Sequence, residues 1–388
     1  MRNFTYSIPT TIFFGEGQIK HLSDLKKSGN KVLLVYGGGS IKKNGLYDKC
    51  MEILSAEGIE VTELSGVEPN PRIESVRKGI ELCKANNIDM ILAIGGGSTI
   101  DCAKVVAAGV YYEGDPWDLV KDGRLIKNAL PIFTVLTISA TGSEMDTFAV
   151  ISDLSTNMKI GTGSSKVRPK MSILDPTFTY SVSKKQTAAG TADIMSHTLE
   201  NYFTTVKGAD LQRNMCEAIL KTLVKYGPIA YNEPDNYDAR ANLMWCSSLA
   251  INGLVSLGSA NAWCVHPMEH ELSAFYDITH GEGLAILTPV WMEFVMKKNP
   301  DTVADFAEFG RNVFGIREED DQACACFAVS AVRTFLFDEM HIPETLQEVG
   351  ITDKSNFEKM AEKAAKGCVG CYEPLTKEDI IEIYEAAF

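Results

Sequence analysis

The sequence from Met90 to Lys104 reads MILAIGGGSTIDCAK: an apolar run, three glycines and a serine, then helix-forming residues. The same order of residue types occurs at Lys31–Ser40, which reads KVLLVYGGGS. Continuous apolar runs that end in glycine are typical of strands buried on both faces, as in a parallel sheet. The two segments therefore predict an open α/β sheet with a glycine-rich turn after each of two strands.

The surrounding sequence extends this pattern through the first half of the chain. Further strands are expected at Ile59–Leu64 and Ile132–Leu136, and helices at Ile73–Asn86 and Thr99–Ala108. From about Ser183 the residues are those of long helices, for example at Ala209–Tyr226 and Tyr237–Asn252. We therefore expect an α/β dinucleotide-binding domain with a parallel sheet at residues 1–180, and an all-helical, metal-binding domain at residues 181–388.

Composition restricts the class of protein. The 388 residues carry a net charge of -14, which disfavours binding to nucleic acid or to an anionic membrane. No stretch is apolar and long enough for a signal peptide or a membrane span. The ten cysteines then indicate reduced thiols rather than disulfides. A cytoplasmic enzyme is the expectation.

The glycine-rich turns predict a nucleotide site. Successive glycines let backbone N–H groups approach a phosphate, and a helix N-terminus adds a favourable dipole. One such turn could be only a tight strand-to-helix connection. Two of them, at the carboxyl ends of buried strands, favour a dinucleotide, although neither matches the G-x-G-x-x-G fingerprint. No acid follows Tyr36, whereas Ser40, Lys42 and Lys43 suit a 2′-phosphate, so NADP(H) is favoured and NAD(H) is possible.

The histidines predict a metal site. Asp193 and His197 are four residues apart and would share one helix face, as would His266 and His270. His280 begins His-Gly-Glu-Gly, which we interpret as a turn that returns its imidazole to the same place. Spacing alone does not decide which of these imidazoles bind the ion. A set of imidazoles and one carboxylate suits Fe²⁺, Zn²⁺, Co²⁺, Ni²⁺ or Mn²⁺.

Several motifs in order resemble those of one known family. They are Phe4-x₄-Pro-Thr-x-Ile-x-Phe-Gly-x-Gly17, Tyr36-Gly-Gly-Gly-Ser-Ile-Lys-Lys43, Gly66-Val-Glu-Pro-Asn-Pro71, Gly95-Gly-Gly-Ser-x-x-Asp-x-x-Lys104, Ala140-Thr-Gly-Ser-Glu144, His266-x₃-His-x₉-His280-Gly and Leu375-Thr-Lys-Glu-Asp379. The chain resembles the iron-containing (group III) alcohol dehydrogenases, in the branch of the butanol dehydrogenases and broad-range NADPH-dependent aldehyde reductases.

The resemblance implies an N-terminal dinucleotide domain, a helical C-terminal domain and one divalent metal, with Fe²⁺ favoured and Zn²⁺ possible, in the cleft between the domains. It implies that Asp193, His197, His266 and His280 are ligands and that His270 lies beside the metal. The implied cofactor contacts are Gly37, Gly38, Gly39, Ser40, Asn70, Gly96, Gly97, Ser98, Asp101, Thr137, Thr141 and Lys159, with Asp101 either near the cofactor or fixing the start of its helix. Asp146 departs from the Asn or Thr of many relatives, which puts substrate preference in doubt.

The function implied is a homodimeric alcohol dehydrogenase that interconverts short-chain primary alcohols and aldehydes by hydride transfer. His270 is the candidate for relaying the proton to solvent, and the competing interpretation is a structural histidine. The alternatives are a lyase of the dehydroquinate synthase type, a glycerol or diol dehydrogenase, and a non-enzymatic binding protein. The lyase would need basic residues for an anionic substrate, and residues 260–282 contain no Lys or Arg.

Overall fold

The computed structural model describes residues 1–388, which form two compact units. The first unit contains Ser7–Val182 and Pro234–Ser248, and the second contains Met1–Tyr6, Ser183–Glu233 and Leu249–Phe388. A division at residue 180 would place residues 1–6 in the sheet unit and residues 234–248 in the helical unit. In the structure, residues 1–6 belong to the helical unit and residues 234–248 to the sheet unit. Met244 gives the reason for the second segment, because its side chain belongs to the hydrophobic core of the first unit.

A six-stranded parallel sheet forms the first unit, with strand order β1-β8-β5-β4-β2-β3. Its strands are β1 (Thr11–Phe14), β2 (Lys31–Tyr36), β3 (Glu60–Leu64), β4 (Met90–Gly95), β5 (Ile132–Leu136) and β8 (Met171–Leu174). The parallel sheet and the four predicted strands are confirmed. The sequence patterns did not predict β1, β8 or the antiparallel hairpin of β6 (Phe148–Asp153) and β7 (Met158–Gly163).

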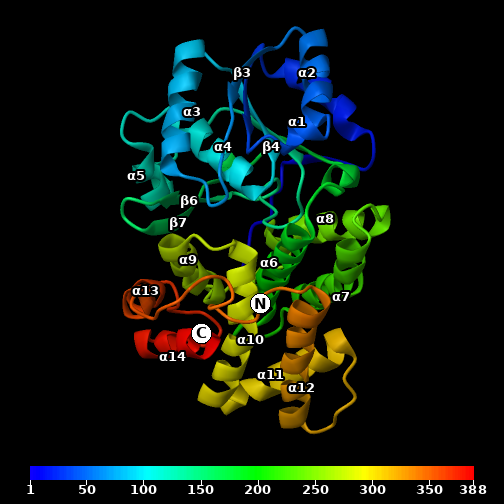
Figure 1. Cartoon of the computed structure of the whole chain (residues 1–388), viewed down its shortest axis with the longest axis vertical. Helices are drawn as coiled ribbons and strands as arrows, with labels where there is room; N and C mark the ends of the chain where they lie inside the picture. The colour runs from blue at the N-terminus through cyan, green and yellow to red at the C-terminus, as the bar shows by residue number, and fades with distance from the viewer. The chain divides into compact units, whose positions relative to one another are not determined.

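Helices cover both faces of the sheet, which is why its strands are apolar on both sides. Leu33 and Val35 of β2 join a core with α3 (Ile73–Asn86), α4 (Gly97–Gly109) and α5 (Pro116–Lys121). The alternate residues, Val32 and Leu34, join a second core with the 3₁₀-helix η1 (Gln18–Lys27), α1 (Ser40–Lys43) and α2 (Leu46–Ala56). Figure 1 shows α3 and α2 on opposite sides of the strands. The predicted helices at Ile73–Asn86 and Thr99–Ala108 correspond to α3 and α4.

The second unit is helical, as predicted. Its α-helices are α6 (Lys184–Tyr202), α7 (Asp210–Asn232), α9 (Val265–Tyr276), α10 (His280–Lys298), α11 (Val303–Phe309), α12 (Asp321–Arg333), α13 (Phe357–Ala364) and α14 (Lys377–Ala387). The helix α8 (Tyr237–Ile251) belongs to the first unit up to Ser248.

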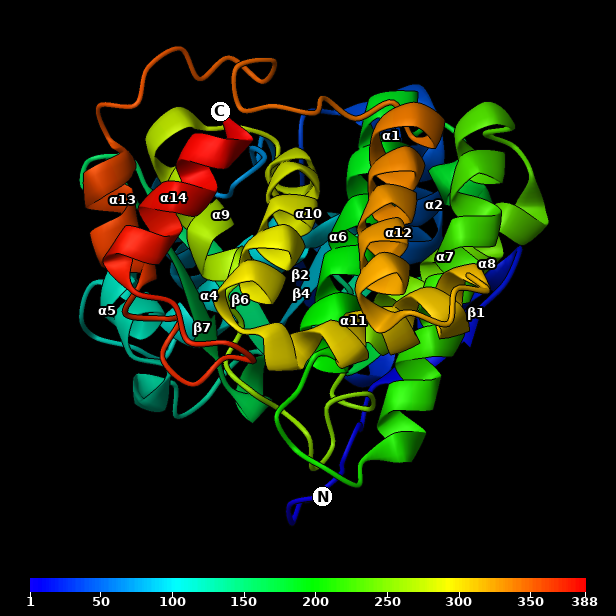
Figure 2. The same ribbon diagram turned by 90° about the horizontal axis from the view of Figure 1, so that it is seen from below.

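The helix α6 is the centre of this unit. It packs against α7 and α10, and α10 in turn packs against α9 (Figure 2). The Ser183 hydroxyl caps its N-terminus by accepting a hydrogen bond from the N–H of Gln186. From Thr187 to Tyr202 every residue of α6 is buried, polar side chains included. A buried helix that carries polar side chains is where a buried ion site can form.

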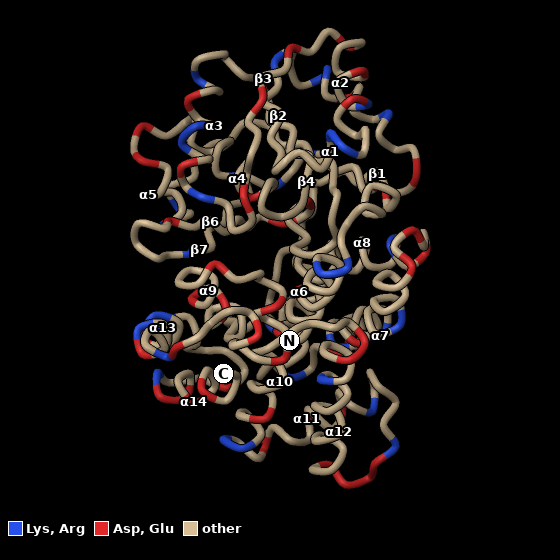
Figure 3. The backbone as a smooth tube through the Cα atoms, viewed as in Figure 1, with Lys and Arg blue, Asp and Glu red and all other residues tan.

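Charges are locally mixed on the helical unit, although the net charge of the chain is -14. Both signs occur on α13, for example, which reads FEKMAEKA (Figure 3). None of the helices combines the length and the apolar character needed to cross a lipid bilayer.

Candidate functional site

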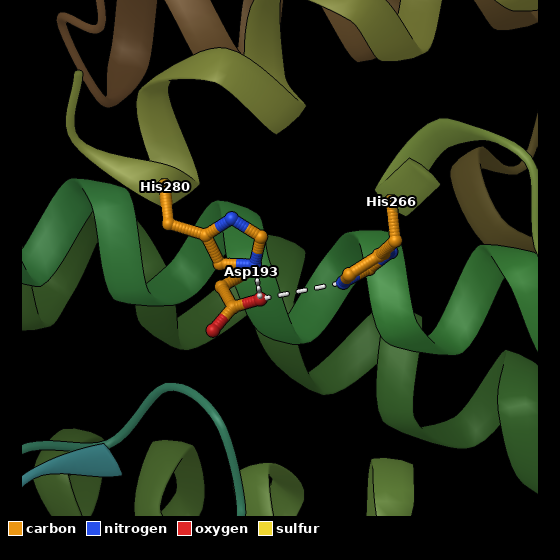
Figure 4. Close-up of side chains that lie close together, drawn as sticks. All are labelled: Asp193, His266 and His280. Carbon is orange, nitrogen blue, oxygen red and sulfur yellow. Dashed lines mark ion pairs between the residues drawn. The ribbon is translucent and has the colours of Figure 1, made fainter. Parts of the chain in front are cut away.

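The predicted metal ligands come from three helices of the second unit. Asp193 and His197 lie one turn apart on α6, His266 is in the first turn of α9, and His280 is the first residue of α10. The Oδ1 atom of Asp193 is 3.5 Å from Nε2 of His197, 3.8 Å from Nε2 of His266 and 3.7 Å from Nε2 of His280. Figure 4 shows the His266 and His280 rings, from two different helices, directed toward the same oxygen of the Asp193 carboxylate.

These distances fit a shared cation better than direct hydrogen bonds, which are about 2.7–3.2 Å long. Asp193 Oδ1 and His266 Nε2 are both buried without a hydrogen-bond partner. Around a tetrahedral ion with bonds of about 2.1 Å, neighbouring ligand atoms lie about 3.4 Å apart. The ligand atoms of Asp193, His266 and His280 all lie within 4.8 Å of one another. His197 is outside that set but still faces Asp193, so the four residues can surround one divalent ion.

Burial and mutual charge set the titration of the cluster. Burial alone would raise the pKa of Asp193, but the three imidazoles, His197 foremost, hold it well below its usual range. Burial lowers the pKa of His197 to about 3. Burial also acts to lower the pKa of His266, but its contacts with the carboxylates of Asp193 and Glu200 raise it overall. A neutral His197 and an ionised Asp193 are the protonation states that a cation requires of its ligands.

The prediction that His280 begins a turn is wrong. His280 begins α10, with Thr279 as the N-cap. The physical reason is at Gly281, where a Cβ would lie 2.0 Å from the carbonyl oxygen of Ala189 on α6. The glycine is required for the close approach of two helices rather than for a turn, and that approach brings His280 to Asp193.

The two glycine-rich turns lie side by side in the first unit. They follow β2 and β4, which are adjacent strands with Tyr36 paired to Ile94. The next strand in sequence, β3, lies on the outer side of β2, so the strand order reverses between β2 and β4. Open α/β sheets bind their ligands at the carboxyl ends of strands at such a reversal.

In the second turn, at Gly95–Ser98, there is no room for side chains at Gly96 and Gly97, so the backbone itself is exposed to a ligand. A Cβ at Gly96 would lie 2.2 Å from Ile138, and one at Gly97 would lie 2.3 Å from Oγ1 of Thr141. The loop after β5, which carries Thr137 and Thr141, therefore packs directly on the turn. Gly97 is the first residue of α4, where backbone N–H groups have no partner within the helix and favour an anion. The residues present fit a dinucleotide phosphate.

The first turn, at Gly37–Ser40, is open, but the nearby Lys42 is paired with an acid. At Gly38 and Gly39 an added Cβ would meet no atom within 4 Å. The ammonium of Lys42 lies 3.4 Å from the carboxylate of Glu63 on β3, which also accepts hydrogen bonds from Tyr36 and Tyr47. The sequence favoured NADP(H) because no acid follows Tyr36 in the turn. The Glu63 carboxylate of the neighbouring strand nevertheless lies beside Lys42, which weakens that argument for NADP(H).

Comparisons with known proteins agree with this arrangement. The model of the iron-containing alcohol dehydrogenase family matches residues 9–176, and that of the C-terminal domain of the Fe-containing family matches residues 187–388. An NADH-dependent butanol dehydrogenase A of Clostridium acetobutylicum is 56% identical over the whole of both chains, and an NADPH-dependent aldehyde reductase of Escherichia coli is 37% identical over the whole of both. The crystal structure of an NADH-dependent butanol dehydrogenase A from Thermotoga maritima has a TM-score of 0.94 at 40% identity, covering 100% of this chain and 99% of that one.

The chain belongs to the iron-containing alcohol dehydrogenase family. It is an alcohol dehydrogenase, an enzyme that interconverts alcohols and aldehydes with a nicotinamide cofactor, and membership of the family implies a divalent metal. The lyase and the non-enzymatic binding protein that the sequence analysis considered are thereby set aside.

The remaining cofactor residues predicted for this alcohol dehydrogenase differ in their surroundings. Asn70 has a φ of 51° in the segment between β3 and α3. Lys159 is buried on β7. Asp101 lies inside α4, where its carboxylate accepts hydrogen bonds from the Ser143 hydroxyl at 2.6 Å and from the N–H of Val150 at 2.8 Å. These two bonds hold α4 to β6 and to the loop before it, so Asp101 has a structural role in the chain itself.

Asp146, which the resemblance singled out, is part of a buried ion pair. Its carboxylate contacts the ammonium of Lys104, which also donates to the Ser143 hydroxyl at 2.8 Å and to the Phe148 carbonyl at 2.7 Å. Burial raises the pKa of Asp146. Lys104 is fully buried, so the pair fixes the loop before β6.

His270 lies beside the ligand cluster. Its ring centroid is 5.6 Å from that of His280 and 6.2 Å from that of His266, and its side chain is half-buried. Two buried carboxylates that contact the cluster were not predicted from the sequence: Glu200 on α6 and Glu269 on α9. Glu200 follows His197 by three residues and Glu269 follows His266 by three, so helical spacing is the signal that places each on the face of a predicted ligand.

Proposed function

We propose that this alcohol dehydrogenase interconverts short-chain primary alcohols and aldehydes, butanol and butanal among them, by hydride transfer. The proposal that the reaction depends on a metal is supported by one observation: three imidazole Nε2 atoms converge on one buried oxygen of Asp193. The substrate class is supported by the names of the relatives, a butanol dehydrogenase at 56% identity and an aldehyde reductase at 37%.

The proposed ligands are Asp193, His197, His266 and His280, and the proposed ion is Fe²⁺, with Zn²⁺ as the alternative. The donor set supports a divalent ion of this kind, because it consists of imidazole nitrogens and a carboxylate without thiolate. When bound, the ion supplies Lewis acidity toward an alcohol or aldehyde oxygen, and the nicotinamide accepts or supplies the hydride. The residues themselves fix the position of that acidity between the helices α6, α9 and α10.

His270 is proposed to exchange a proton with solvent during the reaction. Its imidazole is half-buried beside His266 and His280, and an imidazole titrates near neutral pH. A group in that place can reach both the site and water, which a fully buried ligand cannot.

The proposed cofactor contacts are the two turns and the loops beside them. They comprise Gly37, Gly38, Gly39, Ser40, Asn70, Gly96, Gly97, Ser98, Asp101, Thr137, Thr141 and Lys159. NADP(H) is proposed over NAD(H), on the support of Ser40, Lys42 and Lys43. The Glu63 carboxylate beside Lys42 and the name of the 56%-identical relative support NAD(H) instead. A kcat/KM ratio for NADPH over NADH that is below one rejects the NADP(H) proposal.

A cytoplasmic location and a homodimer are also proposed. None of the ten cysteines forms a disulfide, as expected for a reducing compartment. The strand β1 pairs only with β8, so its other edge offers N–H and C=O groups to a second copy. Light scattering on the purified protein tests the dimer, and a monomer at micromolar concentration rejects it.

The test of the function uses purified protein stripped with a chelator and reloaded with Fe²⁺ or Zn²⁺. Butanal should be reduced with loss of nicotinamide absorbance, and the rate should require the metal. Glycerol and 1,2-propanediol, with oxidised cofactor, test the diol dehydrogenase alternative. Faster turnover of the diols than of butanol would replace the proposed substrate class.

A further inference from the structure

We infer that two buried carboxylates, Glu269 and Glu200, act as positioning residues that aim the Nε2 atoms of His280 and His266 at the metal. The inference rests on the proposed metal site and goes beyond its ligands. Neither carboxylate is among those ligands, and each contacts the far side of one of the imidazoles.

Glu269 holds His280 from behind. One oxygen of its fully buried carboxylate contacts Nδ1 of His280, and the other accepts a hydrogen bond from the Ser273 hydroxyl. A carboxylate only accepts hydrogen bonds, so the proton of the neutral imidazole lies on Nδ1. The lone pair is then on Nε2, the atom that lies 3.7 Å from Asp193 Oδ1.

The neighbouring sequence makes room for this carboxylate. At Gly283, one helical turn after His280, a Cβ would lie 2.9 Å from Cγ of Glu269 and 3.3 Å from its Oε1. Any larger residue at position 283 would push Glu269 out of place. The ring of His280 is therefore held by Glu269, and its backbone by the close approach of Gly281 to α6.

Glu200 does the same for His266, with one more contact. Its Oε1 accepts from Nδ1 of His266 at 2.8 Å and from the backbone N–H of His266 at 2.9 Å, and its Oε2 accepts from the N–H of Cys264 at 2.6 Å. The carboxylate thus holds both the ring and the start of α9. His197 differs, because its Nδ1 is buried without a hydrogen-bond partner.

Two of the three imidazoles therefore have their direction fixed before a metal arrives, with Nδ1 held as the donor to a carboxylate and Nε2 left for the ion. A carboxylate behind a ligand imidazole also makes its free nitrogen a better donor, and loss of such a partner typically weakens metal affinity about 10–100-fold. The competing interpretation of Glu269 is a direct ligand, since its carboxylate, His270 and His280 form a second set with ligand atoms within 4.8 Å of one another.

The test measures the Kd of Co²⁺ by competition with a chelator in the full-length protein. Glu269→Met keeps the volume and removes the acceptor, and should raise Kd about 10–100-fold. Glu269→Gln keeps an acceptor without the charge and should raise Kd by less. Glu271→Gln is the matched control, because Glu271 lies on the same helix and pairs with Lys363 rather than with a histidine. Its Kd should equal that of the wild type.

The visible spectrum of bound Co²⁺ separates the roles of Glu269. If it positions His280, saturating Co²⁺ restores a spectrum of wild-type intensity in both Glu269 variants. A spectrum that stays altered at saturation would overturn positioning in favour of ligation. A wild-type Kd in both variants would overturn the inference altogether. Thermal unfolding of the metal-free proteins checks the fold, and Glu269→Gln remains informative if Glu269→Met does not fold.

Failure of the wild-type protein itself to bind Co²⁺ would instead reject the proposed metal site. Failure of the inference and failure of the proposed function are therefore distinguishable.

Discussion

The substitution Gly281→Ala places a methyl group between α10 and α6. A Cβ at position 281 would lie 2.0 Å from the carbonyl oxygen of Ala189 and 2.5 Å from its carbonyl carbon. Ordinary contact begins at 3.4 Å, so the start of α10 must move by about 1.4 Å, the difference between 3.4 and 2.0 Å. Neither atom is at the end of a flexible side chain, so the helices themselves must separate.

His280 precedes this residue, and Asp193 follows Ala189 by one turn of α6, so the movement separates the two proposed ligands. Misplacement of a reacting group by about 1 Å costs on the order of 10²-fold in rate. Overpacking of this kind also costs about 1–3 kcal/mol of stability. We therefore expect Gly281→Ala to weaken metal binding, to lower kcat/KM about 100-fold with metal present, and to lower the Tm of the metal-free protein.

The assay compares metal Kd, kcat/KM and Tm with those of Gly161→Ala. At Gly161 a Cβ would meet only Cγ2 of Val150, at 3.8 Å, so that control should change none of the three quantities. If Gly281→Ala kept a wild-type Kd and kcat/KM, the argument that this glycine sets the position of His280 would be wrong. A fall in Tm alone would give Gly281 a purely structural role.

Five other substitutions address the remaining parts of the proposal and the burial of Glu144. Asp193→Ala and His197→Ala should each lose bound metal and turnover while circular dichroism stays native, and stoichiometric metal in either would remove that residue from the ligand set. His270→Ala should keep its metal and lose about 10²–10⁴-fold in rate, and wild-type kcat/KM at every pH would exclude it from proton transfer. Gly39→Asp should shift the kcat/KM ratio toward NADH by placing a carboxylate near the 2′ position, and an unchanged ratio would contradict the placement of the ribose. Burial raises the pKa of Glu144 from 4.5 to about 7, so its contribution to stability is present below pH 4.5 and is lost as the pH rises through 7. Glu144→Gln should therefore flatten the fall in the free energy of unfolding across that range, and identical pH slopes for wild type and variant would contradict the assigned burial.

The fold could be predicted where a strand or helix is long and its pattern is strong. The runs from Val32 to Tyr36 and from Met90 to Ile94 are apolar throughout, and glycines end them, so both strands and the parallel sheet could be predicted from the sequence. The strands β1 and β8 have four residues each, too few for a periodic signal, and they pair across about 160 residues of chain. No local pattern could show that Met244 packs into the sheet unit, because that contact depends on where α8 lies in space.

The sequence predicted which side chains converge at the candidate site, and whether they bind a metal stays a prediction. The spacing of Asp193 and His197 is a property of one helix, and the structure places both on α6. The positions of Glu200 and Glu269 could not be inferred in the same way. Exposed glutamates are common at helical spacing, and only burial together with a contact to Nδ1 distinguishes these two.

The four residues from His280 to Gly283 show why a glycine pattern can be misinterpreted. Two glycines within four residues predict a turn, because glycine costs about 1 kcal/mol at each helical position relative to alanine. Here both are helical, and neither has a left-handed backbone. Gly281 lets α10 touch the backbone of α6, and Gly283 leaves space for Glu269. The two glycines lower the helix propensity at the start of α10. That loss is offset by contacts that fix the backbone and the ring of His280.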